Sequence, residues 1–160
     1  MKKLLLLTTL MLISIGMHAQ TIIENPQFSA TMASYVKITK IELQDTVTKI
    51  DFEVTYTPNW WIRVSSEETY IQNSEGGEKL YVTRAEGIKL NEQHWTPESG
   101  LNTYTLYFPP LGKDVEKIDF LEESWKIFDI EIRNNGNTHA SIIPVEIQGN
   151  WLKANGSNEW

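Results

Sequence analysis

The ten residues VTKIDFEVTY, Val47 to Tyr56, decide the fold class of this chain. Ile50, Phe52, Val54 and Tyr56 alternate with charged or hydroxyl-bearing residues, so an extended strand here has one apolar face and one polar face. Successive side chains on a strand point to opposite faces of a sheet, and this alternation is typical of an antiparallel sheet that covers a core on one side. The stretch therefore predicts a half-buried strand.

Further short segments with strand-like patterns lie on both sides of this one, separated by turn residues such as Gly76-Gly77 and by the strand-ending Pro109-Pro110. A change in the phase of the alternation near Lys40 predicts a β-bulge. Seven strands within about 100 residues predict an all-β fold, an immunoglobulin-like antiparallel β-sandwich over residues 35–133, with an open barrel as the alternative. The predicted strands are 35–43, 47–56, 60–64 (with 69–72 as its continuation), 79–84, 101–108, 116–121 and 125–132.

The flanking segments have a different character. Lys2 and Lys3 precede an apolar run and a cleavage region of small residues, so residues 1–19 are expected to be a secretory signal peptide. Residues 20–34 are expected to be an irregular lead-in. Residues 134–160 are expected to hold a linker and the start of a second, truncated module, with one strand at 142–147.

The charge and the cysteine content of the chain restrict which binding partners and which chemistry are expected. Residues 1–19 carry two lysines and no acidic residue, so the formal charge of −7 becomes −9 for the remaining 141 residues. This charge makes nucleic acids and anionic membranes poor partners. The remaining 141 residues contain no apolar run of the roughly 20 residues that a membrane-spanning helix needs, so no transmembrane segment is expected in them. The chain has no cysteine, which excludes thiol chemistry and cysteine metal sites within it.

The adjacent tryptophans Trp60 and Trp61 cannot both face one core if they lie on a strand. Trp60 shares a face with Ile62 and Val64, and we expect it to be a buried anchor. Trp61 lies beside Arg63 on the outer face, where three interpretations compete. Its ring is covered by a loop or by the lead-in, packs on a neighbouring domain, or forms a stacking platform for a sugar or another flat ligand.

Candidate ligand-binding residues follow from the third interpretation. Trp61, Tyr81 and Tyr107 all fall on outer faces of predicted strands, and together they suggest a carbohydrate- or polymer-binding module.

Residues that would support catalysis are few. His94 and His139 lie in different segments and lack metal-ligand spacing. The carboxylate pairs 67–68 and 122–123 are considered as a glycosidase acid and base, but neighbouring carboxylates on a strand face apart and those at turns are usually solvated. No catalytic residue, metal or cofactor is expected, and a small hydrolase is kept only as a third hypothesis.

Several stretches resemble the amino-terminal β-sandwich module of exported thioredoxin-like proteins, the TlpA-like and AhpC/TSA-type thiol-disulfide oxidoreductases of Gram-negative envelopes. The stretches that carry the resemblance are Pro58–Ile62 (PNWWI), Trp95–Gly100 (WTPESG) and Ile118–Glu122 (IDFLE), and 149–160 (GNWLKANGSNEW) is similar to the start of the following module. The resemblance implies a thioredoxin domain with a Cys-x-x-Cys motif further along the chain. Because this sequence has no cysteine, it implies no catalytic residue here.

The resemblance thus implies a non-catalytic accessory module of the periplasm or cell envelope that spaces, docks or recruits. Its expected partner is a downstream thioredoxin-like domain or an envelope protein, whereas the alternative function predicts a glycan.

Overall fold

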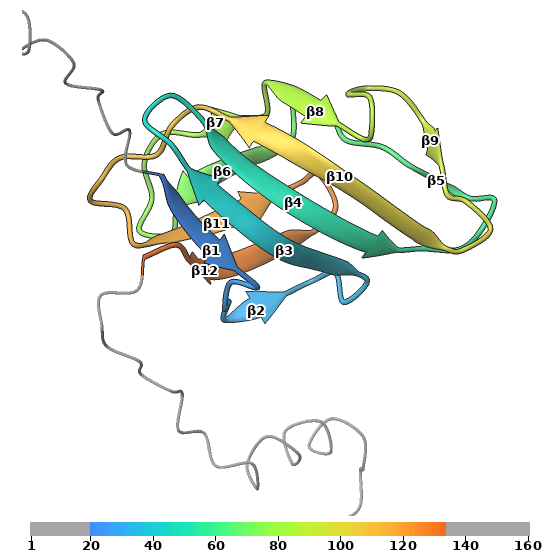
Figure 1. The fold of residues 1–160 in the computed structure, drawn as a ribbon, viewed down its shortest axis with the longest axis horizontal. Helices are drawn as coiled ribbons and strands as arrows, with labels where there is room; N and C mark the ends of the chain where they lie inside the picture. Colours follow the sequence, from blue (N-terminus) through green and yellow to red (C-terminus); the bar gives the residue numbers. More distant parts are fainter. Residues whose placement is uncertain (1–19, 134–160) are drawn as a thin grey trace, which may run out of the picture.

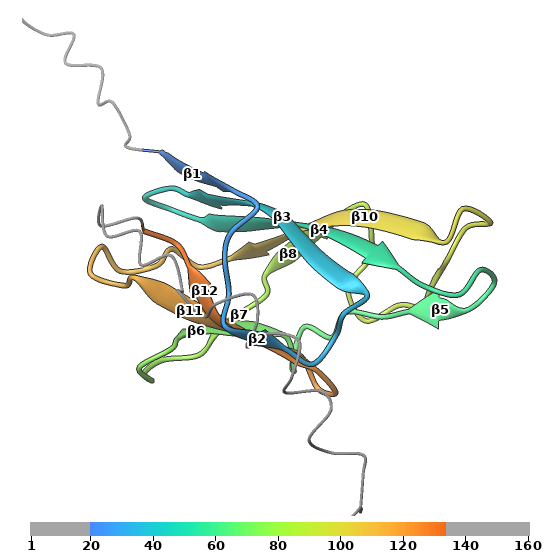
Figure 2. The same ribbon diagram turned by 90° about the horizontal axis from the view of Figure 1, so that it is seen from below.

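The structure is a computed structural model that describes residues 20–133. Two five-stranded antiparallel sheets face each other, and a two-stranded sheet extends from one end of them (Figures 1 and 2). The first sheet contains, in spatial order, β1 (Thr21–Glu24), β3 (Val36–Leu43), β4 (Thr48–Thr55), β10 (Leu101–Phe108) and β8 (Arg84–Glu86). The second contains β2 (Ala30–Thr31), β12 (Lys126–Glu131), β11 (Lys117–Leu121), β6 (Tyr70–Asn73) and β7 (Leu80–Tyr81). The small sheet pairs β5 (Trp61–Ile62) with β9 (His94–Trp95).

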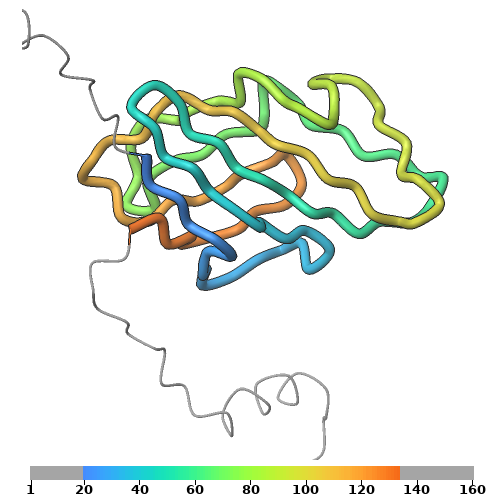
Figure 3. The backbone as a smooth tube through the Cα atoms, viewed as in Figure 1, coloured from blue at the N-terminus to red at the C-terminus, as the bar shows by residue number. Residues whose placement is uncertain are grey.

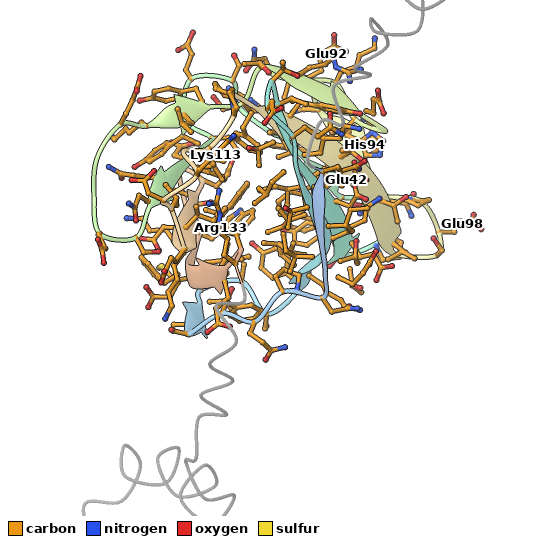
Figure 4. All side chains as sticks on the ribbon, turned by 60° about the vertical axis from the view of Figure 1, so that its left-hand side comes forward. Glu42, Glu92, His94, Glu98, Lys113 and Arg133 are labelled. Atoms are coloured by element: carbon orange, nitrogen blue, oxygen red, sulfur yellow. The ribbon has the colours of Figure 1, made fainter. Side chains whose placement is uncertain are left out.

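The core lies between the two large sheets, where Figure 4 shows side chains filling the space. The decisive strand β4 alternates as its sequence predicts: Ile50, Phe52 and Val54 are buried, and the residues between them are half-exposed. Phe120 from the opposite sheet lies 5.0 Å from Phe52 between ring centroids, so aromatic contacts join the two layers. Without a disulfide, this buried apolar surface is the main source of stability.

The strand order is that of an immunoglobulin-like sandwich. The orders β3-β4-β10-β8 and β12-β11-β6-β7 correspond to the A-B-E-D sheet and to a G-F-C sheet with one added strand. The predicted fold class is confirmed, and the open barrel does not form because the edge strands β7 and β8 belong to separate sheets. The predicted bulge is also confirmed, since the β3–β4 register shifts between Ile38 and Lys40.

The expectation of an irregular lead-in at 20–34 is corrected by two short strands. β1 pairs with β3 at the edge of the first sheet, and β2 pairs with β12 at the edge of the second. The segment therefore closes one side of the sandwich. Its strands are only four and two residues long, and Ile22 of β1 is exposed, so no extended alternation marks them in the sequence.

Two of the predicted strands were wrong in their extent. Residues 60–64 and 69–72 do not form one strand, because β5 belongs to the small sheet and β6 to the second large sheet. The predicted strand 79–84 divides in the same way, since β7 pairs with β6 whereas β8 pairs with β10. In both places the chain crosses from one sheet to another, and buried residues at the crossing, such as Val64 and Val82, continue the apolar pattern.

The two ends of the described chain lie at the end of the sandwich opposite β5 and β9 (Figures 1 and 3). Thr21 pairs with Leu43 at the far end of β3. Arg133 donates a hydrogen bond of 2.9 Å to the carbonyl of Gly112, which lies in the loop between β10 and β11. The small sheet thus points away from the places where the chain enters and leaves.

Within residues 20–133 there is no helix, and so none long and apolar enough to cross a membrane. The expected signal peptide at 1–19, and the expected linker, second module and strand in 134–160, lie outside the described residues.

Candidate functional site

A tight turn begins the small sheet. The Trp60 amide donates to the carbonyl of Thr57 at 3.1 Å, which closes a four-residue turn with Pro58 and Asn59 at its centre. Asn59 has a φ of 62°, and a turn with proline at its second position and asparagine at a left-handed third position is of type II. The Pro-Asn pair therefore dictates where the chain reverses.

The same asparagine begins a bulge. The Asn59 amide donates to the carbonyl of Thr96 at 3.2 Å, and the Thr96 amide donates to the carbonyl of Trp60 at 2.8 Å. Two residues thus face one, which is the pattern of a G1 bulge that starts with a left-handed residue. β5 and β9 follow directly, with Trp61 opposite Trp95.

Three tryptophans of this small sheet and its bulge are exposed. The exposed fractions are 62% for Trp60, 45% for Trp61 and 61% for Trp95. The prediction that Trp60 is a buried anchor is wrong, because β5 is two residues long and lies beyond the end of the core. Of the three interpretations of Trp61, cover by a loop does not apply to a side chain with this exposure.

The fourth tryptophan of residues 20–133, Trp125, lines a pocket together with Trp61. All four tryptophans of the described chain therefore gather at one end of the sandwich. We call this region the aromatic end and define it by these four residues together with Tyr35 and Tyr56, whose ring centroids are 5.7 Å apart. Single exposed apolar side chains are common, whereas a gathered set makes this end the candidate site of the described chain.

The structure does not bring the three predicted ligand-binding residues together. Trp61, Tyr81 and Tyr107 belong to three different sheets. Tyr81 is exposed on the edge strand β7, 5.4 Å from Tyr70 between ring centroids. Only Trp61 belongs to the aromatic end.

Tyr107 is not available for stacking, which corrects its assignment as an exposed aromatic. It is 7% exposed, and the Arg84 guanidinium lies 3.7 Å from the centre of its ring. Arg84 is its cross-strand neighbour on β8, and Lys49 is its neighbour on β4. Burial and a hydrogen bond with Glu86 raise the pKa of Tyr107.

The pocket of the aromatic end opens between the two large sheets beneath β5 and has a volume of about 280 Å³. Its lining comes from the β4–β6 segment, the β11–β12 turn and the start of β3, and from core-facing residues of β4, β10 and β11. The residues that carry rings or charges are Tyr35, Tyr56, Trp61, Arg63, Glu68, Tyr104, Phe120, Glu122, Glu123 and Trp125.

Burial shifts the ionisation of the pocket's acidic groups. Burial raises the pKa of Glu122, and the neighbouring carboxylates Glu123 and Glu68 raise it further, against the lowering effects of a backbone hydrogen bond and of Arg63. Burial likewise raises the pKa of Tyr104 and that of Tyr35. The pocket thus disfavours additional negative charge.

One polar group in the lining is unsatisfied. Thr69 is fully buried, and its hydroxyl oxygen has no hydrogen-bond partner within residues 20–133. A buried hydroxyl without a partner costs roughly 1–3 kcal/mol, so such groups are uncommon unless something else satisfies them.

Sequence reasoning missed that members of the two carboxylate pairs would line the same pocket. Glu68 and Glu122 come from different connections, yet both line the pocket. Their arrangement is visible only once the strand order is known, because the β4–β6 connection and the β11–β12 turn of an immunoglobulin-like sandwich lie at the same end. His94 lies on β9 opposite Ile62, and no group of three or more potential metal ligands occurs in the described part of the chain.

Comparison of the chain with protein-family models, with curated proteins and with solved structures gives no match. The resemblance to exported thioredoxin-like proteins therefore stays a prediction.

Proposed function

We propose that this chain is a non-catalytic interaction module of an exported protein, and that it binds a carbohydrate or another polymer at the aromatic end. The observation that carries this proposal is the gathering of all four tryptophans of residues 20–133 at one end, three of them exposed. Large flat side chains supply much contact area with few rotatable bonds, so they bind with little loss of conformational entropy.

The backbone structure that carries the exposed tryptophans is expected to hold them as a rigid platform. A turn, a bulge and paired strands hold Trp60, Trp61 and Trp95, so their backbone geometry is set before a ligand arrives. Preorganisation of this kind lowers the entropic cost of binding. A sugar ring presents C–H groups that pack on such a surface, and its hydroxyl groups stay in water.

The position of the aromatic end suits a module within a longer protein. The described chain enters and leaves at the opposite end (Figures 1 and 3). A neighbouring domain attached at either terminus would leave the tryptophans accessible.

The accessory role in a thioredoxin-like protein of the envelope rests on the sequence resemblance alone. The three stretches on which that resemblance rests converge at the aromatic end. Pro58–Ile62 and Trp95–Gly100 meet in the small sheet, and Ile118–Glu122 ends in the pocket. Sequence beyond residue 160 that encodes a Cys-x-x-Cys domain would support this parent protein, and a different downstream domain would contradict it.

The binding proposal is tested with a glycan array followed by titration calorimetry. Trp61→Ala and Trp95→Ala are expected to weaken binding at least about tenfold each, as expected for anchor aromatics. Tyr81→Ala is the matched control, because it removes an exposed aromatic outside the aromatic end, and its affinity should equal that of the parent chain. Binding that survives both tryptophan variants, or no binding to any glycan, would refute the proposal.

A further inference from the structure

The pocket beneath β5 has aromatic walls. Trp61 lies at its exposed side, and the tilted pair Tyr35–Tyr56 contributes a second wall. Phe120 and Trp125 stack with ring centroids 5.2 Å apart and form a third. Such a space accepts an apolar or aromatic body, and the negative faces of its rings favour a positive charge nearby.

The charged residues of the lining have an acidic balance. The lining contains three acidic residues, Glu68, Glu122 and Glu123, and one basic residue, Arg63. None of the four forms an ion pair with another residue of the described chain. Glu122 is the least exposed of the three acids. A half-buried carboxylate without an ion pair gains more from a bound cation than a solvated one does, because water screens it less.

Thr69 provides an independent sign of a missing partner. Thr69 lines the same pocket, and its buried hydroxyl oxygen has no hydrogen-bond partner within residues 20–133. A hydroxyl oxygen accepts hydrogen bonds, and an ammonium group has three donors and no acceptor. One ammonium group can therefore donate to a carboxylate and to a hydroxyl oxygen at the same time.

We propose that this pocket binds a primary ammonium group carried on an aromatic or other apolar body, with Glu122 and Thr69 as the acceptors. The inference deepens the proposed function, on which it rests, by naming the chemical group that enters the pocket beside the tryptophan platform. The ammonium group belongs either to a free amine or to an amino group on a polymer.

Three small molecules of nearly equal shape test the charge requirement: 2-phenylethylammonium, 2-phenylethanol and phenylacetate. Binding to the full-length chain is followed by tryptophan fluorescence and by amide chemical shifts. The ammonium compound is expected to bind at least about tenfold more tightly than the alcohol, and phenylacetate more weakly than the alcohol. Equal affinities, a preference for phenylacetate, or no binding of the ammonium compound at millimolar concentration would overturn the proposal.

Two variants identify the acceptors. Glu122→Gln is expected to reduce the preference for the ammonium compound at least about fivefold. Thr69→Val, which keeps the shape and removes the hydroxyl, should weaken ammonium binding about threefold. Glu98→Gln is the matched control, because Glu98 lies outside the pocket in the turn after β9, and Figure 4 shows it pointing away from the sandwich. An effect of Glu98→Gln equal to that of Glu122→Gln would refute the assignment, as would an unchanged preference in both Glu122→Gln and Thr69→Val.

A comparison of ligands separates this inference from the proposed function. Trp95 does not line the pocket, so Trp95→Ala should leave the affinity for 2-phenylethylammonium unchanged while it weakens glycan binding at least about tenfold. A glycan that binds while the ammonium compound does not would defeat only the inference. If the ammonium compound binds and no glycan does, only the carbohydrate proposal fails. An amino sugar compared with its N-acetylated form then tells whether the ammonium group can reside on a polymer.

Discussion

The central strands β3, β4 and β10 differ from the aromatic end in how far their apolar side chains are buried and their charged side chains are paired. In the centre, apolar residues face the core, and four charged residues on the outer face form a connected set of ion pairs. Lys40 lies 2.8 Å from one carboxylate oxygen of Glu42 and 3.0 Å from Asp51, and Lys49 lies 3.3 Å from the other oxygen of Glu42. At the aromatic end, three tryptophans are exposed and the carboxylate of Glu122 has no ion pair within residues 20–133.

On the binding proposal, this difference means that the residues that stabilise the fold and the residues that bind a ligand lie in separate regions. A region whose groups satisfy one another has little to offer a ligand, whereas exposed rings and an unpaired half-buried acid gain from a partner. Substitutions in the central strands should therefore affect unfolding, and substitutions at the aromatic end should affect binding.

The largest contrast is expected between two aromatic residues. Phe52 is 1% exposed and contacts both Tyr104 and Phe120, so Phe52→Ala should lower the free energy of unfolding by about 3–5 kcal/mol. Trp60 is 62% exposed, so Trp60→Ala should change it by less than about 0.5 kcal/mol. Urea unfolding curves measure both values, and a loss of stability in Trp60→Ala comparable to that in Phe52→Ala would remove the contrast.

The same difference explains how much of the fold the sequence predicts. The strands β4, β10 and β11 and the bulge of β3 follow from alternation, because these strands run for five residues or more beside the core. β12 was predicted as a strand but does not alternate, since its register with β11 shifts and Ile127 and Ile130 are both buried. Alternation identifies a face only while a strand stays regular. At Trp60 a left-handed residue and a bulge interrupt the strand, so parity no longer tells which side is buried.

Other misses have a related cause. The chain crosses between sheets at Val64 and Val82. Both residues are apolar where the alternation expects an apolar residue, and both are buried in the structure, so nothing in the local sequence marks the crossing. The pocket could not be predicted because its residues come from strands and connections that only the strand order brings together. Among the predicted ligand-binding residues, the sequence singled out Trp61 because it follows another tryptophan, Trp60. It could not show that Arg84 covers Tyr107, because that contact depends on the pairing of β8 with β10.

A second prediction concerns the turn that creates the aromatic end. Asn59 has a φ of 62°, which a β-branched residue adopts only with strain. Asn59→Val should therefore destabilise the chain by about 1–3 kcal/mol and shift the amide signals of Trp61 and Trp95. Asn59→Gly should stay within about 0.5 kcal/mol of the parent, because glycine accepts this conformation.

These two variants also tell whether the turn sets the geometry of the platform. If Asn59→Val leaves both the stability and the tryptophan signals unchanged, the left-handed residue is not what holds the small sheet in place. Glycan affinity should fall in Asn59→Val and persist in Asn59→Gly.

The smallest expected effect concerns folding stability, to which Glu42 and Glu122 should contribute with opposite dependences on pH. Ion pairing with Lys40 holds the pKa of Glu42 below its ordinary value, so its stabilising contribution is present above that value and is lost as the pH falls through the folded-state pKa. Burial raises the pKa of Glu122, so its contribution is fully present below the ordinary value and is lost as the pH rises through the folded-state pKa.

The two glutamine variants should therefore differ in sign near neutral pH. At about pH 7, Glu42→Gln should destabilise the chain by about 0.5–1 kcal/mol, whereas Glu122→Gln should be neutral or stabilising by no more than about 1 kcal/mol. Towards about pH 3, both differences should shrink as the two carboxyls become protonated and resemble the amide. Urea midpoints at constant slope measure them, and a Glu122→Gln variant that is destabilised at neutral pH would mean that the acid is already satisfied without a ligand.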